Sequence, residues 1–384
     1  MTSYGAHLRQ FWPLDPDVTY LNHGGYGVTP HDVLALQAIW RERIEKNPTR
    51  FMTAEYPAAI RQVAAVLARY VGAQADELVL VDNATSGCNA VLRSLDLKPG
   101  DEILTTNLAY GAITKAARYA AERAGALVVI ADLPLPAEDE DGIAAALALH
   151  LTGKTRLVIL DHILSPTGLV MPARRLADLA HDAGARVLVD GAHAPGNLLL
   201  NLPATGADWY VANCHKWLFA PRACGFLWAA GTAREMVHPL SMSHGYGQGM
   251  VAEFDWTGTR DPSAFLSIPA GLAFHERLGG AALMAHNAEM VHGAARRLAE
   301  LWDTEVAMPS DMCAAMAGIR LPAGLVDSMA EAAALRTWLS EERKIEVALS
   351  YYDDAAWVRI AAQAYNEESD YDALSEAIAA FRAR

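Results

Sequence analysis

Short apolar runs recur through the middle of the chain, and stretches with helical patterns separate most of them. The apolar runs lie at residues 78–81, 103–104, 127–130, 157–160, 187–189 and 210–212. The helical stretches lie at residues 110–124, 143–151 and 172–183. Continuous apolar strands that alternate with helices are typical of a mainly parallel sheet covered by helices on both faces. The pattern therefore predicts an α/β fold.

Two helices are predicted before this sheet. The first begins at Pro30, with Thr29 as its N-cap, and ends where Asn47 precedes a proline. The second runs over residues 57–71 and stops at Gly72, because glycine readily adopts the left-handed backbone that terminates helices.

The pattern changes after about residue 265. Alanine-rich helices are predicted at residues 270–278, 281–302 and 328–340, with short strands at residues 317–321, 346–349 and 357–361. We interpret residues 18–264 as a large α/β domain and residues 265–384 as a smaller α+β domain. The N-terminal segment, residues 1–17, is expected to pack near the smaller domain.

The composition is that of a globular protein. Of the 384 residues, 52% are apolar and 20% are charged, which allows a large core and excludes a disordered chain. The formal net charge is −14, whereas a nucleic-acid-binding protein is expected to carry a basic surface, so no nucleic-acid partner is expected.

Neither an export signal nor a membrane span is expected. Residues 1–20 contain Arg9, Asp15 and Asp17 and no apolar segment. The apolar runs are far shorter than the roughly 18 residues needed to span a bilayer. The four cysteines show no metal-ligand spacing, so we expect no metal site and interpret them as reduced thiols of a cytoplasmic protein.

Polar residues follow five of the predicted strands. These clusters lie at residues 82–87, 105–107, 161–168, 190–193 and 213–216. In open α/β sheets, ligands bind outside the carboxyl ends of the strands. The five clusters therefore predict one shared ligand-binding crevice.

Two glycine-containing segments match nucleotide-binding loops only in part. Residues 153–155 (GKT) resemble the end of a P-loop, but Ala148 stands where a glycine is required, and a strand follows instead of preceding. Residues 245–249 have the spacing G-x-G-x-G in place of G-x-G-x-x-G. A nucleotide-dependent α/β enzyme is therefore disfavoured.

Residues 83–87 (NATSG) are better placed to bind an anion. They follow a strand and open a helix, so small residues leave backbone N–H groups free and the helix dipole favours negative charge. An ordinary capped helix start explains the same pattern equally well.

Asp190 and Lys216 are the most informative pair of residues. Asp190 ends an apolar strand, and Lys216 follows another strand beside His215 and an apolar segment, residues 217–219. Apolar surroundings disfavour the charged amine and lower the pKa of a lysine, as a Schiff-base lysine requires. The alternative is a lysine whose amine reaches the solvent along an apolar surface.

Three segments surround this pair, namely residues 187–196 (VLVDGAHAPG), 207–210 (ADWY) and 213–218 (NCHKWL). Together they resemble the core signature of class V aminotransferase-fold enzymes, which depend on pyridoxal 5′-phosphate (PLP). Four further segments resemble the isopenicillin N epimerase-like branch, namely residues 20–27 (YLNHGGYG), 165–168 (SPTG), 258–261 (GTRD) and 358–360 (VRI). The resemblance covers residues 18–375 and implies fold type I, with a mainly parallel seven-stranded-type sheet between helices and a smaller C-terminal domain.

The resemblance implies roles for the residues around the cofactor. Lys216 would hold PLP as a Schiff base and then act on the Cα proton, and Asp190 would pair with the pyridinium nitrogen. His193 would lie near the ring and its phenolic oxygen. The other expected cofactor contacts are Ala84, Thr85 and His215 at the phosphate, Ser165 near the phenolic oxygen, and Tyr110 stacked on the ring. For Tyr110, a core aromatic at a helix start is nearly as good an explanation.

The resemblance also implies contacts to a small amino-acid substrate and to a second subunit. Arg359 would bind the substrate α-carboxylate as a fork, unless it forms a surface ion pair. Asn22 and His23 would line the substrate mouth, unless they belong to a simple glycine-rich turn. Thr259 would reach the phosphate of the neighbouring subunit, which predicts a homodimer with a shared site.

The reaction itself stays open between several alternatives. Racemisation or epimerisation at Cα and C–S or β-elimination rank close together, with transamination third, because one cofactor supports all of them. Cys313 lacks a mobile Gly/Ser-rich loop, so we interpret it as a small buried residue, which weighs against desulfurase chemistry. A non-catalytic binding relative should have lost Lys216 or Asp190, and both are present.

Overall fold

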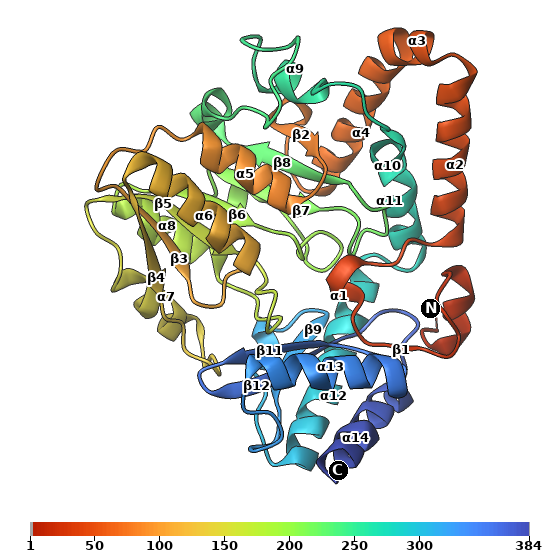
Figure 1. Ribbon diagram of the computed structural model, residues 1–384. Helices are drawn as coiled ribbons and strands as arrows, with labels where there is room; N and C mark the ends of the chain where they lie inside the picture. The colour runs from red at the N-terminus through yellow and green to blue at the C-terminus, as the bar shows by residue number, and fades with distance from the viewer. Residues whose placement is uncertain (1–2, 384) are drawn as a thin grey trace.

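The computed structural model describes residues 3–383 and contains a seven-stranded sheet between helices (Figure 1). The strand order is β2-β8-β7-β6-β5-β3-β4, and only β8 runs against its neighbours. The strands are β2 (Leu78–Val81), β3 (Glu102–Thr106), β4 (Leu127–Ala131), β5 (Thr155–Asp161), β6 (Arg186–Asp190), β7 (Trp209–Asn213) and β8 (Gly225–Ala229). This arrangement confirms the predicted α/β fold with a mainly parallel sheet.

All six predicted strands are present, and β8 is an additional strand that was not predicted. No helical stretch separates β8 from β7, so the alternation of strands and helices did not mark it. β8 pairs with β7 and β2 in antiparallel register, which leaves the other six strands pointing the same way.

Alternate residues of the sheet enter two different hydrophobic cores. In β5, Leu157 and Ile159 face one core, and Val158 and Leu160 face the other. Helices α5 (Ala84–Ser94) and α6 (Gly111–Ala124) contribute to the first core, whereas α7 (Glu140–Ala148), α8 (Ala173–Asp182) and α4 (Tyr56–Tyr70) contribute to the second. Burial on both faces explains why the strands read as continuous apolar runs.

A three-stranded antiparallel sheet lies in the C-terminal part of the chain. Its order is β11-β12-β9, with β9 (Met316–Arg320), β11 (Ala348–Tyr352) and β12 (Ala355–Ala361). Its helices are α12 (Ala281–Trp302), α13 (Met329–Glu342) and α14 (Glu368–Arg382), seen below the larger sheet in Figure 1. These elements match the predicted helices and strands closely, and the domain boundary at residue 264 stays a prediction.

The first described residues contact the C-terminal part. The Gly5 N–H donates to the carbonyl of Ala364 at 2.8 Å. Strand β1 (Thr19–Tyr20) pairs in parallel with β10 (Ile345–Glu346), so the N-terminal segment lies against the C-terminal part (Figure 1). The remaining helices are α1 (His23–Tyr26), α2 (His31–Lys46), α3 (Pro48–Arg50), α9 (Met250–Asp255), α10 (Ser263–Leu266) and α11 (Ile268–Arg277).

The start of α2 differs from the prediction by one residue. Pro30 is its N-cap, and Thr29 lies outside the helix, so the predicted Thr29 cap was wrong. The Thr29 hydroxyl donates instead to the carbonyl of Ala220 at 3.2 Å, a tertiary contact that a local pattern does not reveal. The predicted end of α4 is correct, because Gly72 follows it with a left-handed φ of 70°.

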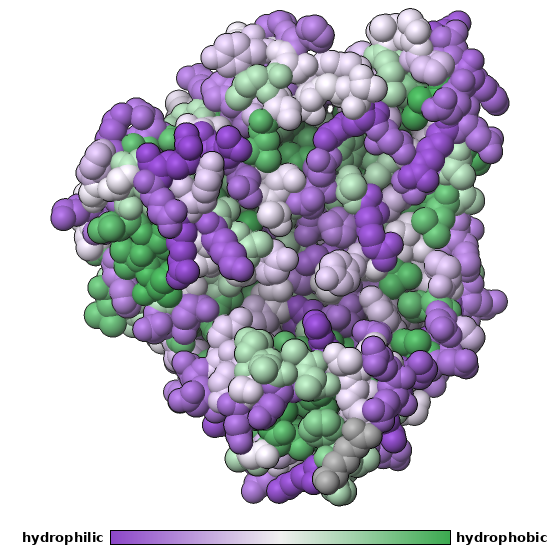
Figure 2. Space-filling model, in the orientation of Figure 1, coloured by the Kyte–Doolittle hydropathy of each residue, from purple (hydrophilic) through white to green (hydrophobic). Residues whose placement is uncertain are grey.

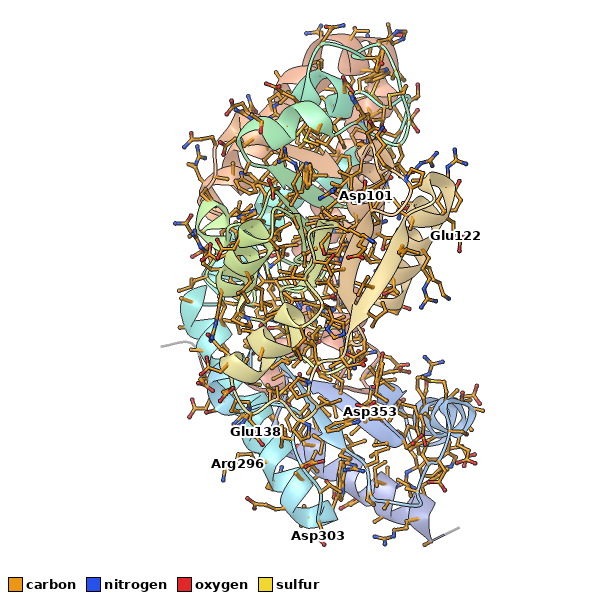
Figure 3. All side chains as sticks on the ribbon, turned by 90° about the vertical axis from the view of Figure 1, so that its left-hand side faces the viewer. Asp101, Glu122, Glu138, Arg296, Asp303 and Asp353 are labelled. Atoms are coloured by element: carbon orange, nitrogen blue, oxygen red, sulfur yellow. The ribbon has the colours of Figure 1, made fainter. Side chains whose placement is uncertain are left out.

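Charged side chains are spread over the outside of the molecule. Of the six charged residues labelled in Figure 3, Asp101 is half-buried and the other five are exposed, namely Glu122, Glu138, Arg296, Asp303 and Asp353. Among the described helices, none combines the length and the apolar character that crossing a bilayer requires.

Gly27 packs directly on the backbone of the segment that carries the two residues His215 and Lys216. It has a left-handed φ of 66°, and a Cβ at this position would collide with the carbonyl oxygen of His215. Its own carbonyl accepts a hydrogen bond from Arg222 Nη2 at 3.1 Å. Only glycine satisfies both the backbone conformation and the close approach.

We expect Gly27→Ala to lower the free energy of unfolding by about 3 kcal/mol or more, the sum of a left-handed alanine and a backbone collision. Gly100→Ala is the matched control, because Gly100 has a φ of 86° and nothing lies near its missing Cβ. The control should cost only about 1 kcal/mol. Urea denaturation of both variants measures the difference, and equal losses would contradict the packing argument.

Candidate active site

Six strands of the larger sheet end at one edge, and a cavity of about 310 Å³ lies there. Residues from the polar strand-end clusters and from the N-terminal segment line it. They are Gly25, Tyr26, Asn83, Ala84, Thr85, Tyr110, Asp161, Ser165, Asp190, Ala192, His193, Asn213, His215, Lys216, Arg222 and Ala223. The structure therefore brings together all the predicted cofactor-binding residues except Thr259, which is exposed and lies outside this inner cavity.

A second, outer cavity of about 600 Å³ opens from the inner one. Lys216, Tyr110 and Ser165 line both cavities, so the two are continuous. The outer walls come from α13, β10 and β11 of the C-terminal part. Arg359 of β12 and Asn22, which precedes α1, also line this cavity. Figure 2 shows that the middle of this face of the molecule is mainly hydrophilic.

Lys216 and His193 form a hydrogen-bonded nitrogen pair inside the cavity. Lys216 Nζ lies 3.0 Å from His193 Nε2. Burial, and then the positive charge of Arg359, lower the pKa of Lys216 to about 7. Burial also lowers the pKa of His193 well below its ordinary value, so this imidazole is neutral at pH 7. The amine is thus available as a neutral base near pH 7, as predicted for a lysine in apolar surroundings.

Two carboxyl groups lie side by side at the ends of β5 and β6. Asp161 and Asp190 are direct register partners on these parallel strands, and both are buried. Asp190 Oδ1 accepts a hydrogen bond from the Ala192 N–H at 2.9 Å. Burial raises the pKa of both groups, and the neighbouring Asp190 raises the pKa of Asp161 further. A buried carboxyl in this position suits a cationic partner such as a pyridinium nitrogen.

Asp161 and Arg222 line the inner cavity but are absent from the predicted set of site residues. Asp161 has a signal in the sequence, because it ends a strand just as Asp190 does. Arg222 has none, since it belongs to the irregular segment between β7 and β8. Arg222 reaches the site because its guanidinium donates to Gly27, far away in sequence.

The start of α5 provides an anion-binding end at the cavity. Asn83 caps the helix by accepting from the Ser86 N–H at 2.8 Å, and the Ala84 N–H donates to Asn213 Oδ1 at 2.8 Å. Thr85 lines the cavity at the first turn, where the helix dipole is positive. His215 is held by a contact of 3.1 Å between its Nδ1 and the carbonyl of Cys224.

Arg359 is a buried cation held in place beside the outer cavity. Its Nη2 donates to Asn22 Oδ1 at 2.8 Å, and its Nη1 donates to the carbonyl of Ser165. Only 4% of its surface is exposed, which excludes the alternative of a surface ion pair. Its Nε is buried without a hydrogen-bond partner among the described residues, so donor capacity remains for a ligand.

His23 lies behind the site and does not line the substrate mouth, so this prediction was wrong. It is 1% exposed, and its Nε2 lies 3.0 Å from the carbonyl of Lys216. Its Nδ1 lies 3.0 Å from the Tyr365 hydroxyl. His23 therefore supports the backbone of the lysine, and Asn22 alone of the pair lines the outer cavity.

Cys313 is half-buried and lines neither cavity. Its thiol donates to the carbonyls of Ala314 and Met316 at 3.4 Å. Burial raises the pKa of this thiol to about 12. Since the thiolate is the nucleophile, this cysteine is not activated for sulfur transfer.

The cavity fits PLP by the chemistry of its walls. It combines a lysine with a lowered pKa, a buried carboxyl pair and the positive end of α5. His193 Nδ1 is in addition buried without a hydrogen-bond partner in the described part of the chain. The lysine can bind the aldehyde carbon of PLP, the carboxyl pair its ring nitrogen, and the positive end of α5 its phosphate.

Comparison with known proteins identifies the family. The family description "Aminotransferase class-V" matches residues 20–374, so the chain belongs to the class V aminotransferase family. The members of this family are PLP-dependent enzymes, and this chain is therefore a PLP-dependent enzyme of fold type I.

Several relatives match over nearly the whole chain. A probable chloroplastic L-cysteine desulfhydrase of Arabidopsis thaliana is 33% identical over 95% of this chain and 83% of its own. Isopenicillin N epimerase of Streptomyces clavuligerus is 33% identical over 95% of both chains. A solved structure of the cystine C–S lyase C-DES with its reaction product cysteine persulfide is 26% identical, with a TM-score of 0.81 over 95% of this chain and 98% of that one.

We expect Lys216 in the cofactor-free protein to react as a neutral amine above pH 7. Its modification by acetic anhydride, followed by peptide mass spectrometry, should be half-maximal near pH 7, because burial lowers its pKa to about 7. Arg359→Met removes a positive charge and should shift the profile to higher pH. The exposed Lys98 serves as the internal control. A Lys216 midpoint near pH 10 in both proteins would contradict this electrostatic account.

Proposed function

We propose that the enzyme catalyses β-elimination from an amino acid that carries a sulfur substituent on Cβ. When bound, PLP would withdraw electrons from Cα and make its proton acidic. The balanced reaction converts R–S–CH₂–CH(NH₃⁺)–COO⁻ and water into RSH, pyruvate and ammonium. The enzyme's part is to orient the substrate and to move one proton from Cα to the departing sulfur.

The observation that carries this proposal is the contact of 3.0 Å between Lys216 Nζ and His193 Nε2. Near pH 7 the imidazole is neutral, and a large fraction of the amine is neutral because its pKa is about 7, so the amine can accept the Cα proton and the imidazole can share it. β-Elimination needs proton transfer on one side of the substrate only. One nitrogen pair is therefore sufficient to remove the proton from Cα and to deliver it to the departing sulfur.

Arg359 and Asn22 are suited to orient the substrate. The guanidinium lies at the wall of the outer cavity, close to Ser165 and Asn22. A planar fork binds a carboxylate through two parallel hydrogen bonds, which fixes the Cα–H bond relative to Lys216. Two of the relatives named above, the probable L-cysteine desulfhydrase and the cystine C–S lyase, also support the proposed elimination.

Epimerisation at Cα is the second candidate, supported by Tyr110 and by the isopenicillin N epimerases. Tyr110 is 45% exposed and lines both cavities, so its hydroxyl can approach a bound substrate. Epimerisation needs a second proton donor on the face opposite the lysine, and a phenol can serve in this role.

We expect the holoenzyme to form pyruvate and sulfide from L-cysteine, and pyruvate from L-cystine. Lys216→Ala should lower the rate by about 10²- to 10⁴-fold, because the proton-transfer group is lost. Lys98→Ala, on the exposed surface, is the control.

The same incubation in D₂O separates the alternatives. The appearance of the opposite enantiomer with deuterium at Cα and no pyruvate would overturn elimination in favour of epimerisation. A requirement for an added keto acid would indicate transamination instead.

We also propose that two chains share the site, with Thr259 binding the phosphate of PLP in the partner subunit. Thr259 is exposed, and the adjacent Arg260 forms an ion pair of 2.8 Å with Asp82 at the end of β2. This ion pair holds the segment beside the start of α5, because Asp82 lies two residues before that helix.

Thr259→Ala should lower PLP affinity about tenfold through the loss of one phosphate contact, while Thr53→Ala, also exposed, leaves it unchanged. PLP retained after dialysis measures the effect, and sedimentation equilibrium should give the mass of two chains. A one-chain mass with full PLP retention would contradict a shared site.

A further inference from the structure

The outer cavity is larger than the reacting end of the substrate, which consists of Cα with its amino and carboxylate groups. Its volume of about 600 Å³ lies in the range of pockets that hold drug-sized ligands, roughly 300–1,000 Å³. Lys216 and Arg359 account for the amino and carboxylate groups on Cα. The rest of the cavity is therefore available to the group R that sulfur carries.

Two elements of the C-terminal part form the wall that faces this group. On α13, Arg336 and Glu341 line the cavity within about one and a half turns of each other. From β10, Glu346 lines it, and the Ser340 hydroxyl donates to Glu346 Oε1 at 2.5 Å. Arg336 and Glu341 are both exposed to solvent in the cavity mouth.

A buried polar atom in the same wall also calls for a ligand. Ser350, Ala348 and Tyr352 alternate along β11 and line the outer cavity. The Ser350 hydroxyl is buried and has no hydrogen-bond partner within residues 3–383. Because a buried hydroxyl without a partner is costly, a hydrogen-bonding group in the cavity would stabilise it.

The charges that remain on this wall have opposite signs. Arg336 supplies a cation, and Glu341 and Glu346 supply carboxylates, whereas Arg359 is assigned to the α-carboxylate at the reacting end of the substrate. An anionic group alone would face the two glutamates, and a cationic group alone would face Arg336. A zwitterion matches both signs at once.

We propose that the outer cavity is a subsite for a second amino-acid headgroup carried on the sulfur of the substrate. Arg336 binds its carboxylate, Glu341 and Glu346 bind its ammonium group, and Ser350 donates or accepts a hydrogen bond. This inference rests on the proposed β-elimination for its catalytic readout. It defines the substrate class as thioethers and disulfides that join two amino acids.

The test compares two thioether substrates of the holoenzyme. L-Lanthionine carries a second amino-acid headgroup on sulfur, and S-methyl-L-cysteine carries none. In the wild-type enzyme, the ratio of kcat/KM for L-lanthionine to kcat/KM for S-methyl-L-cysteine should be about 100. In Arg336→Gln this ratio should fall about tenfold, because one charge-assisted contact is lost. Glu341→Gln should lower the same ratio by a smaller factor, because Glu346 remains.

Two further substrates test each sign of charge separately. S-carboxymethyl-L-cysteine should lose rate in Arg336→Gln and gain rate in Glu341→Gln, and S-(2-aminoethyl)-L-cysteine should respond in the opposite way. Arg343→Gln is the matched control, because Arg343 follows the same helix, stacks on Trp338 and lines neither cavity. This control should keep the wild-type ratio.

An equilibrium measurement keeps the subsite testable apart from the reaction. The absorbance change of the bound cofactor on titration gives a Kd for each of the four amino acids. One outcome separates the two proposals: no compound yields pyruvate, yet L-lanthionine binds more tightly than S-methyl-L-cysteine and loses this advantage in Arg336→Gln. The proposed reaction would then be wrong, and the subsite would be supported. Equal affinities that no wall variant changes would overturn the subsite.

Discussion

The site depends on the common direction of six strands in the larger sheet. Because β2, β3, β4, β5, β6 and β7 point the same way, polar residues that are far apart in sequence meet at one edge. The cores on both faces exclude water from that edge. The same exclusion lowers the pKa of Lys216 and raises the pKa of Asp190, so the chemistry follows from the burial that the sheet direction imposes.

Much of this edge could be predicted from local patterns. Apolar runs indicate strands buried on both faces, and the residues after each run fall at its carboxyl end. Asp190, His193 and Lys216 could therefore be placed at this edge from the sequence alone. The predicted helix of residues 281–302 agrees with α12 at both ends, since glycines precede it and an aspartate with left-handed backbone follows it. Such signals work because they act within one or two turns of the chain.

The errors share a different cause. Thr29 and His23 use their polar atoms on the carbonyls of Ala220 and Lys216, about two hundred residues away. Arg222 enters the cavity because its guanidinium reaches Gly27. The local sequence does not identify such distant partners. A polar residue in a glycine-rich turn is therefore predicted to contact a ligand whether it faces the cavity or the backbone behind it.

The segment from β1 to Thr29 has a consequence for how the molecule is assembled. It is synthesised long before its partners, because β1 pairs with Ile345 and Asn22 binds Arg359. Closing loops of this length carries a large entropic cost before any contact forms. Proteins rich in such distant contacts fold slowly. The cavity wall is therefore complete only after Arg359 has been made, and a nascent chain that stops before residue 345 carries Lys216 without its enclosure.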